Sequence, residues 1–565
     1  YWLSEKSGSF NIWKHSISTG KDTQVTKHET HPVRFLSIAD DGTMAYFYDG
    51  EIYTVKDGAE PVKVSMEIRS DRTEPDYIVQ YRSAGVSSMA VSPSGKEVAF
   101  IMRGDVYVAS TEYGTTVRIT DTPEQERDID FSPDGRSIVY SAERNGCWNV
   151  YMSEIVKKDE TMFTYATEIE EKPVTEGNVA RFQPSFSPDG KEVAFLEART
   201  TLRVINLKSG KIRTILDGNY NYSYSDGDQW YQWSPDGKWF AVNFFEKGGW
   251  NYVDLGLVKA DGSGELHNLT ESGYSDSGAH FVLDGNAILW YTDKNGYRSH
   301  GSWGSYTDIY IMFFNKESYD SFMRDKEEGE VYAMMQEASK KNKKDDKKDK
   351  DSTKADLPEV EYDFDNIEDR MVRLTVNSAT YGDCYLNNDG SKLYYLAAFE
   401  GGYDLWTRDL KEGDTRLVAK LNTYSGMFDT DETGNQVYIL SSGRISSLDL
   451  NSGMMKPVGI SAEFNYRPAL EREYIFNHAW QQVVDKFYDP DIHGIDWAMY
   501  KEAYSRFLPY INNNFDFSEM LSELLGELNA SHTGSRFYNY GGGDATAVFG
   551  VFFHNDYEGD GLMVA

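Results

Sequence analysis

The chain has 565 residues and a mass of 64.4 kDa, which at about 150 residues per domain suggests about four domains. Its 91 acidic and 57 basic residues leave a formal net charge of −34, and so acidic a surface repels phosphate, so nucleic acid and anionic membranes are not expected partners. Hydrophobic residues make up 40% and aromatic residues 14% of the chain, which allows a large core and excludes global disorder. Two cysteines, Cys147 and Cys384, are too few for a disulfide framework or a cysteine-rich metal site.

The start of the chain predicts a truncated N-terminus. No stretch approaches the roughly 20 apolar residues that span a bilayer, and Tyr1-Trp2-Leu3 resembles neither a signal peptide nor a translation start. These residues read as the interior of a folded domain. We therefore expect a longer gene product, in which any targeting signal would precede Tyr1.

A turn motif, Ser-Pro-Asp-Gly or a close relative, recurs along the chain before an apolar strand. In this motif Pro presets φ, Asp bonds its own backbone and Gly takes the φ > 0 position of a tight hairpin. The clear copies are Ser92-Pro93-Ser94-Gly95, Ser132-Pro133-Asp134-Gly135, Ser187-Pro188-Asp189-Gly190 and Ser234-Pro235-Asp236-Gly237, and looser copies are Asp41-Gly42, Asp284-Gly285, Asp389-Gly390 and Thr433-Gly434.

A second mark follows each turn and consists of a polar residue, an aliphatic residue and usually an aromatic one. Examples are Glu51-Ile52-Tyr53, Asp105-Val106-Tyr107, Asn149-Val150-Tyr151, Asp308-Ile309-Tyr310 and Asp404-Leu405-Trp406, and Asn11-Ile12-Trp13 is the same mark without its turn. The turn glycines are 40 to 55 residues apart, with one step of 105 residues. This period, with several strands per unit, is typical of β-propeller blades. An irregular all-β sandwich is the alternative, and the joint recurrence of both marks argues against it.

The long step predicts an insertion within one blade. Lys316 to Ala338 is rich in Glu, Met and Ala and is expected to be helical, and residues 340–351 mix Lys and Asp with no apolar side chain. A segment that buries nothing is expected to be a solvated, mobile loop.

The number of repeats exceeds one ring. With the Asn11 unit there are nine units, whereas propellers typically have about four to eight blades. The seven turns from Gly95 to Gly434 would close one seven-bladed ring over about 75–460. Residues 1 to about 70 then correspond to the last blade and a half of another propeller, and the exposed strand edges of an open ring again indicate truncation.

Helical periodicity replaces the strand pattern after Pro468. Apolar residues lie on one face from Phe476 to Phe487, a second helix is expected from Asp496, and Asp516-Phe517-Ser518-Glu519 predicts the capped start of a third. So small a module with such apolar faces must pack on another part of the protein.

Between the first two of these helices lie Asp489, Asp491 and His493. The cluster suggests a metal site, but the ligands are too few at a workable spacing. We favour a helix-breaking turn and expect no metal or cofactor.

Ser531-His532 follows the third helix. A polar C-terminal cap is the simpler interpretation, although a His at a helix C-terminus among small residues is accessible for proton transfer. Adjacent Ser and His side chains are poorly placed to form a nucleophile–base pair, so a general base here would need a nucleophile from elsewhere in the fold.

The last residues predict a linker and two strands. Tyr540-Gly541-Gly542-Gly543 reads as a linker, and Val548 to Phe553 and Gly561 to Ala565 are strand-like. Because the chain stops within a strand pattern, we expect truncation at the C-terminus as well.

Together these features resemble the bacterial tricorn protease homologues. The resemblance rests on tandem Ser-Pro-Asp-Gly propellers, on a late blade whose charged insertion leads into Asn366-Ile367-Glu368-Asp369-Arg370-Met371-Val372-Arg373-Leu374, and most specifically on Phe487-Tyr488-Asp489-Pro490, His493-Gly494-Ile495-Asp496-Trp497 and Leu524-Leu525-Gly526-Glu527-Leu528-Asn529-Ala530-Ser531-His532-Thr533. It covers nearly the whole chain, but the propeller repeats alone are shared by many propellers.

The resemblance implies a mainly β fold: a seven-bladed β-propeller preceded by the remnant of another propeller and followed by a small α-helical core subdomain and the start of a PDZ-like domain. The expected domains are 1–72, the end of a six-bladed propeller; 73–460, the seven-bladed propeller with a charged insertion at 316–360; 461–540, the helical first core subdomain; and 541–565, the start of the PDZ-like domain.

The resemblance also implies a serine peptidase that shortens peptides by acyl transfer, with the propeller filtering or channelling them, and assembles as a homo-oligomer, typically a hexamer. His532 matches the family's general base and Ser531 an auxiliary member of its catalytic tetrad. The family's nucleophilic Ser and its Glu partner lie in a second core subdomain that this sequence does not reach, so the chain by itself is expected to be inactive. The family is cytoplasmic, and a periplasmic location stays open.

Two other functions compete with this one. A prolyl oligopeptidase-type enzyme would need a Gly-x-Ser-x-Gly motif on an α/β-hydrolase domain, and the sequence lacks both. A non-catalytic binding propeller of the Tol-type periplasmic class shares the repeat, but the helical module and Ser531-His532 argue against it.

Overall fold

The computed structural model describes residues 1–565 except 68, 70–73, 246–251, 299–303, 344–356 and 539–549. The chain divides into two compact units, one formed by Tyr1–Asp76 with Pro468–Ala565 and the other by Tyr77–Arg467. Both chain ends therefore belong to one unit. No helix in the described residues is long and apolar enough to cross a membrane.

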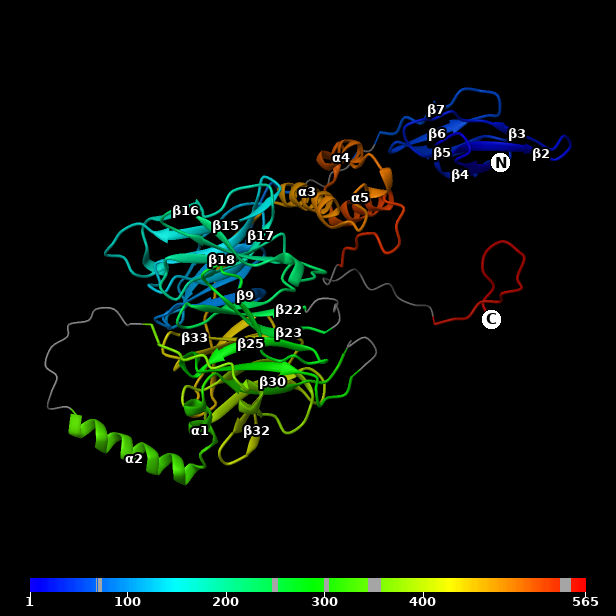
Figure 1. Cartoon of the computed structure of the whole chain (residues 1–565). Coiled ribbons are helices and arrows are strands. Elements are labelled where there is room, and N and C mark those ends of the chain that lie inside the picture. Colours follow the sequence, from blue (N-terminus) through cyan, green and yellow to red (C-terminus); the bar gives the residue numbers. More distant parts are fainter. Residues whose placement is uncertain (68, 70–73, 246–251, 299–303, 344–356, 539–549) are drawn as a thin grey trace. The chain divides into compact units, whose positions relative to one another are not determined.

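The described part of Tyr77–Arg467 forms seven four-stranded antiparallel sheets, which confirms the seven-bladed propeller (Figure 1). The first sheet consists of β9 (Val86–Val91), β10 (Glu97–Met102), β11 (Asp105–Ser110) and β12 (Thr116–Arg118). The second consists of β13 (Glu126–Phe131), β14 (Ser137–Arg144), β15 (Cys147–Ile155) and β16 (Ile169–Pro173). The third consists of β17 (Arg181–Phe186), β18 (Glu192–Glu197), β19 (Thr201–Asn206) and β20 (Ile212–Leu216). Each sheet is built from consecutive strands, so no strand is exchanged between the first and last blades.

The other four sheets follow the same order. They are β21 (Tyr231–Trp233), β22 (Trp239–Phe244), β23 (Asp254–Lys259) and β24 (Leu266–Asn268); β25 (Asp276–Val282), β26 (Ala287–Thr292), β27 (Asp308–Phe313) and β28 (Met371–Arg373); β29 (Thr380–Leu386), β30 (Lys392–Ala398), β31 (Tyr403–Asp409) and β32 (Thr415–Thr423); and β33 (Gly426–Thr430), β34 (Val437–Ser441), β35 (Arg444–Leu448) and β36 (Met455–Pro457). A separate pair, β8 (Ile78–Arg82) with β37 (Ala462–Tyr466), joins the two ends of this unit.

The Ser-Pro-Asp-Gly turns connect the first and second strands of these sheets as predicted. In the second sheet the Ser132 hydroxyl donates to Asp134 at 2.7 Å and accepts from the Ser137 N–H at 2.9 Å. Gly135 takes φ 70°, a value that a side chain would strain. The turn is thus closed by its own side chains, and the second strand enters the core directly after it.

In the four-stranded sheets that carry it, the second sequence mark lies on the third strand, and its polar residue can hold the end of the antiparallel fourth strand. Asp105 is 6% exposed and pairs with Arg118 on β12 at 2.9 Å, and burial raises its pKa to about 6. Asp404 accepts backbone N–H groups of Leu421 and Asn422 in the same way. The aliphatic and aromatic residues that follow fill the apolar layers between neighbouring sheets.

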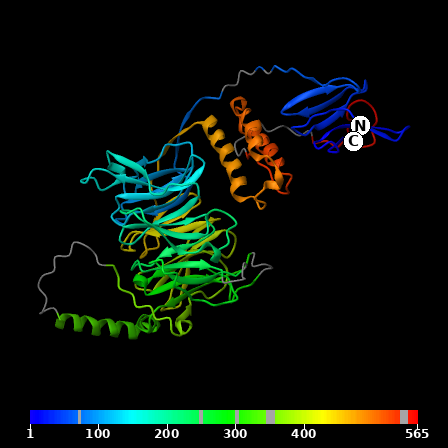
Figure 2. The ribbon, with the colours of Figure 1, turned by 45° about the horizontal axis from the view of Figure 1, so that its top comes forward.

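The described part of the insertion contains two helices. It forms α1 (Lys316–Met323) and α2 (Lys326–Lys343), and α2 extends away from the sheets in both views (Figures 1 and 2). Most of the charged stretch 340–351 lies outside the described residues.

The other unit contains the predicted blade and a half. A three-stranded sheet, β1 (Trp2–Ser4), β2 (Asn11–Ser16) and β3 (Lys21–Gln24), precedes a four-stranded sheet, β4 (Arg34–Ile38), β5 (Met44–Tyr48), β6 (Glu51–Val55) and β7 (Val62–Lys63). They share a core that includes Ile12, Val33, Met44 and Tyr46.

Three helical segments after Pro468 complete this unit: α3 (Pro468–Lys486), α4 (Trp497–Ser505) and α5 (Asn514–Gly526). Phe476, Trp497, Phe517 and Leu524 form their common core. The predicted start of α5 was wrong by three residues, because Asn513 rather than Asp516 caps the helix and accepts the Asp516 N–H at 2.9 Å.

The C-terminal strands are not formed as predicted. Residues 539–549 lie outside the described part, and the described residues 550–565 are exposed and share only an isolated bridge between Phe553 and Val564. Apolar side chains such as Phe552 have no core here to pack against.

Candidate active site

The Ser531-His532 loop begins directly after α5. Leu528 is 2% exposed and ends the buried part of the segment, whereas Ser531 and His532 are exposed. Asn529 and His532 both take left-handed backbone conformations, with φ of 47° and 62°. Such values are uncommon for residues other than Gly, and they turn the loop sharply at both points.

The side chains of Ser531 and His532 contact each other in this loop. The Ser531 Oγ lies 2.6 Å from the His532 Nδ1, at a residue whose backbone is left-handed. The contact occupies Nδ1, and no hydrogen bond of Nε2 is found among the described residues. An imidazole whose Nδ1–H donates to Ser531 has an unprotonated Nε2, which is the form a general base requires.

His493 supports the base of this loop, a role that the sequence did not indicate. Its Nδ1 lies 3.1 Å from the Leu528 carbonyl oxygen, and because a carbonyl only accepts, Nδ1 carries the proton. Its Nε2 then accepts from the Tyr488 hydroxyl.

The turn that carries His493 is organised by Asp489, as the turn interpretation predicts. The Asp489 carboxylate accepts the N–H groups of Asp491 and His493, each at 3.1 Å. Both oxygens of the Asp489 carboxylate therefore accept hydrogen bonds from the backbone of the turn. In the described residues there is no group of three or more His, Cys, Asp or Glu side chains placed to hold a metal ion.

Glu527, four residues before Ser531, is a further residue that sequence reasoning missed. Its side chain is 8% exposed and lies 2.8 Å from the Arg34 guanidinium of β4, and it also accepts from the Tyr504 hydroxyl at 2.8 Å. Burial, with the Glu527 charge, raises the pKa of Tyr504 well above its usual range, and burial raises that of Tyr500 to about 12. Both phenols therefore stay protonated and remain donors at neutral pH.

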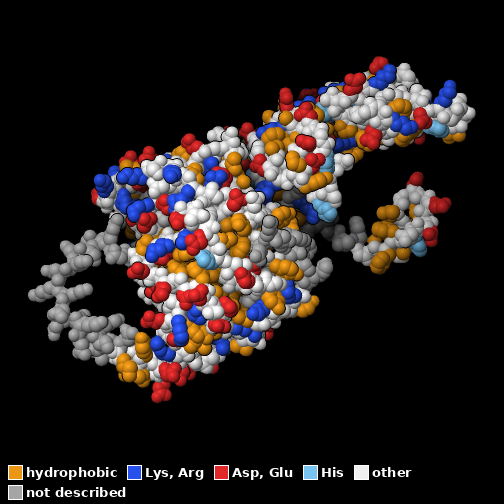
Figure 3. All heavy atoms as spheres, in the orientation of Figure 1, with side chains coloured by type: hydrophobic (Ala, Val, Ile, Leu, Met, Phe, Trp, Pro, Cys, Tyr) orange, Lys and Arg blue, Asp and Glu red, His pale blue; other side chains and the backbone are white. Residues whose placement is uncertain are grey.

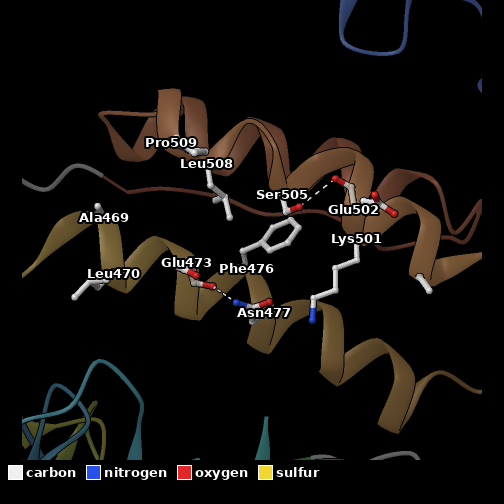
Figure 4. Close-up of a pocket in the computed structure, with 11 residues that line it drawn as sticks. Ala469, Leu470, Glu473, Phe476, Asn477, Lys501, Glu502, Ser505, Leu508 and Pro509 are labelled. Atoms are coloured by element: carbon white, nitrogen blue, oxygen red, sulfur yellow. Dashed lines mark hydrogen bonds between the residues drawn. The ribbon is translucent and has the colours of Figure 1, made fainter. Parts of the chain in front are cut away.

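A groove of about 520 Å³ lies between α3 and α4 (Figure 4). Phe476 points from α3 toward Leu508 and Ser505, and Lys501 extends from α4 toward α3 (Figure 4). The Lys501 ammonium lies 4.2 Å from the centre of the Trp480 ring, and burial lowers its pKa. Ser531 and His532 do not line this groove, so it is separate from the candidate proton-transfer site.

Carboxylates lie on the first strands of several propeller sheets, and some of these strands contact each other, such as β13 with β17 and β33 with β9. Asp130 accepts the Phe186 N–H at 2.8 Å, and Asp429 accepts the Val91 N–H at 2.6 Å. Burial raises the pKa of Asp130 to about 6 and that of Asp429 to about 7. Elsewhere, acidic and basic side chains both lie over the face of the sheets shown in Figure 3.

The fold and the loop define a propeller protein with a helical module that exposes a Ser–His pair, and comparisons with known proteins show what it is similar to. The family model of the tricorn protease C1 domain matches residues 468–526. The putative tricorn-like protease C-terminal subunit of Sulfurisphaera tokodaii is 22% identical over 591 residues, which cover 99% of this chain and 61% of the relative. The tricorn protease homolog of Saccharolobus solfataricus is 20% identical and covers 99% of this chain, which matches 49% of the relative.

The crystal structure of the tricorn protease superposes with a TM-score of 0.68 at 14% identity, covering 94% of this chain and 50% of that one. Over nearly its whole length the chain is thus similar to tricorn proteases, and residues 468–526 match their C1 domain. It spans about half to three fifths of the length of these relatives.

Proposed function

We propose that this chain is the part of a tricorn-type serine peptidase that supplies the general base His532. The observation that carries the proposal is the exposed imidazole whose Nδ1 faces Ser531 and whose Nε2 is left for a second hydroxyl. It stands six residues after the segment that matches the tricorn C1 domain. Ser531 is the auxiliary residue that orients the ring.

In the proposed mechanism, Nε2 removes the proton from a serine hydroxyl supplied by sequence outside these 565 residues. The serine oxygen attacks a peptide carbonyl carbon, and the tetrahedral intermediate collapses as the imidazolium protonates the leaving amine. Water, deprotonated by the same imidazole, then hydrolyses the acyl-enzyme ester and regenerates the serine. The propeller filters or channels the peptide toward this site.

The same resemblance carries three further parts of the proposal. Residues 541–565 would open a PDZ-like domain, the complete protein would form a homo-oligomer, typically a hexamer, and it would work in the cytoplasm. Sedimentation velocity of the complete gene product checks the assembly, and a monomer at micromolar concentration would contradict it.

The test of the catalytic role is His532→Ala in the complete gene product. General-base catalysis contributes about 10²- to 10⁴-fold, so we expect turnover of a fluorogenic peptide to fall by that factor. Because the ring is exposed, the free energy of unfolding should change by less than about 0.5 kcal/mol. Near-normal turnover would refute the role of His532.

A serine-directed fluorophosphonate probe separates the peptidase from a propeller that only binds. The wild-type gene product should be labelled at one serine outside this chain, and His532→Ala should be labelled far more slowly. A folded wild-type protein that neither labels nor hydrolyses peptides would instead support the non-catalytic binding propeller.

A further inference from the structure

Glu527 joins the two ends of the polypeptide next to the Ser531-His532 loop. One carboxylate oxygen lies 2.8 Å from Arg34, which stands on the first strand of the β4–β7 sheet, and the other accepts from Tyr504 of α4 at 2.8 Å. The Glu527 side chain is 8% exposed and that of Arg34 is 30% exposed. Both oxygens are thus held, by groups on two different elements.

The bonds of Glu527 act on the loop through its next residue. Leu528 is buried, and its carbonyl oxygen is held at 3.1 Å by His493. The chain is therefore anchored at two consecutive residues just before the left-handed turn at Asn529. With the backbone anchored there, the turn sets the direction in which Ser531 and His532 leave the helix.

We propose that Glu527 is a positioning residue of this site and that Arg34 is its essential partner. Through this pair, the N-terminal β4–β7 sheet holds the loop that carries the general base. The inference rests on the proposed function for its catalytic consequence but not for the contact itself. Neither residue touches the reacting atoms in this role. Their contribution is to hold the imidazole where a serine from elsewhere in the protein can reach it.

The physical reason is the cost of releasing a buried carboxylate. A carboxylate this shielded loses its charge partner and its hydrogen bonds if the segment swings outward, and charged hydrogen bonds are stronger than neutral ones. Removing Arg34 leaves that charge poorly compensated, so the end of α5 would open more often. An active-site group displaced by about 1 Å can lower turnover about 100-fold.

The first test uses the 565-residue chain and does not depend on activity. Hydrogen–deuterium exchange should show amides of residues 528–536 exchanging at least about tenfold faster in Arg34→Met and Glu527→Gln than in the wild type. Arg34→Lys keeps the charge and should restore most of the protection. The Gln variant is nearly isosteric and keeps a hydrogen-bonding group for Tyr504, so it should fold even if Arg34→Met does not.

Arg506→Met is the matched control. Arg506 also joins the helical segments to the β4–β7 sheet, through Asp49 at 2.6 Å, but both side chains are more exposed and the bond involves no residue of α5 or of the loop that follows it. Residues 528–536 should keep wild-type exchange in this variant. Unchanged exchange in Glu527→Gln, or equal loosening in Arg506→Met, would overturn the proposed role of Glu527.

The second test measures peptide hydrolysis by the complete gene product. Arg34→Met should lower kcat about 10- to 100-fold with KM within about twofold, and Arg34→Lys should recover much of the loss. Loosened exchange without an effect on kcat would show that the network supports only the fold, and would overturn the positioning role. A wild-type protein without peptidase activity would refute the proposed function, while the exchange experiment would still decide whether Glu527 and Arg34 hold the loop.

Discussion

Asp308, at the start of β27, has a fully buried side chain that forms hydrogen bonds with the end of β28 and the segment after it. It accepts hydrogen bonds from Arg373, Thr375 and Ser378, each at 2.7 Å. The bonds span 65 to 70 residues of sequence, including the whole helical insertion. The Asp308 carboxylate thus joins the start of β27 to the segment that follows the helical insertion.

Asp308→Ala should be among the most destabilising single changes in the propeller. It removes three acceptor contacts and leaves Arg373 without its carboxylate partner, which should cost about 3–5 kcal/mol in the free energy of unfolding. Urea unfolding followed by tryptophan fluorescence measures this. Asp159→Ala, at an exposed position of the same unit, is the control and should change the value by less than about 0.5 kcal/mol.

At the scale of elements, α5 shows how a cap is chosen among similar residues. Asn513 and Asp516 are both good N-cap residues, and each is followed by a helical pattern. In the fold Asn513 accepts the Asp516 N–H, and its own amide donates to the Asp516 carboxylate at 2.7 Å. The Asp516 carboxylate thus holds the Asn513 side chain, while Asn513 alone caps the backbone and starts the helix.

The assignment of this cap predicts different effects for the two residues. Asn513→Ala leaves an N–H of the first turn without its acceptor and should destabilise the helical module by about 1 kcal/mol. Asp516→Ala removes only the side-chain bond to Asn513 and should cost about half as much or less. Thermal unfolding of both variants compares them, and a larger loss for Asp516→Ala would contradict the cap.

At the scale of the whole ring, the first and last blades meet without exchanging a strand. Asp429 of β33 accepts the Val91 N–H of β9, the Gly443 carbonyl oxygen accepts the N–H groups of Gly85 and Val86 at 2.9 and 3.1 Å, and one hydrophobic core spans both sheets. These contacts replace the strand pairing that would otherwise close the ring.

The closing carboxylate makes ring stability depend on pH. Burial raises the pKa of Asp429 to about 7, above the value of about 3.9 expected in the unfolded chain. The folded state therefore binds the proton of Asp429 more tightly than the unfolded chain does. The contribution of this proton to the free energy of unfolding is fully present below about pH 4 and is lost as the pH rises through about 7. Because Asn does not ionise, the Asp429→Asn variant does not lose this stability as the pH rises.

Relative to the wild type, Asp429→Asn should gain about 1–2 kcal/mol between pH 5 and pH 8, on top of any pH-independent cost. Urea unfolding at both pH values measures the difference. Asp449→Asn, in the hairpin after β35, is the control, because the Ser452 N–H lowers the pKa of Asp449 and both of its titrations lie below pH 5. An equal pH response in the two variants would rule out Asp429 as the source.

In the unit that contains both chain ends, Gly50 makes a close approach to the helical segments. Gly50, at φ 76°, packs directly against the Phe507 ring, and a Cβ at this position would overlap that ring. Gly58, at φ 80°, has nothing within 4 Å of such a Cβ. Comparing Ala substitutions at Gly50 and Gly58 therefore separates the cost of backbone strain from the cost of steric overlap.

Gly58→Ala should cost about 1–2 kcal/mol from its left-handed backbone alone, and Gly50→Ala about 1–3 kcal/mol more from the overlap. Native-state hydrogen exchange of Trp497–Ser505 should reveal the difference, since only the Gly50 variant disturbs the helical segments. Equal exchange of α4 in both variants would show that the contact with Phe507 does not stabilise it.

Local residue patterns determined most of this fold. The Ser-Pro-Asp-Gly turns, the polar starts of the third strands and the 3–4 spacing after Pro468 each act within a few residues, so the sequence alone predicted seven blades, the blade and a half before them and the helices after them. It also singled out Ser531-His532, through the resemblance to the tricorn family. The role of that pair stays a proposal.

Only the tertiary structure decided what surrounds that pair. Arg34 and Glu527 are 493 residues apart, and His493 reaches Leu528 across 35 residues, so neither partner is visible in a local pattern. The contact between Ser531 and His532 is made where the backbone of His532 is left-handed, a conformation that the sequence did not predict at this residue. Turns and helices follow from neighbouring residues, whereas a site made of side chains from both ends of a chain exists only once the chain has folded.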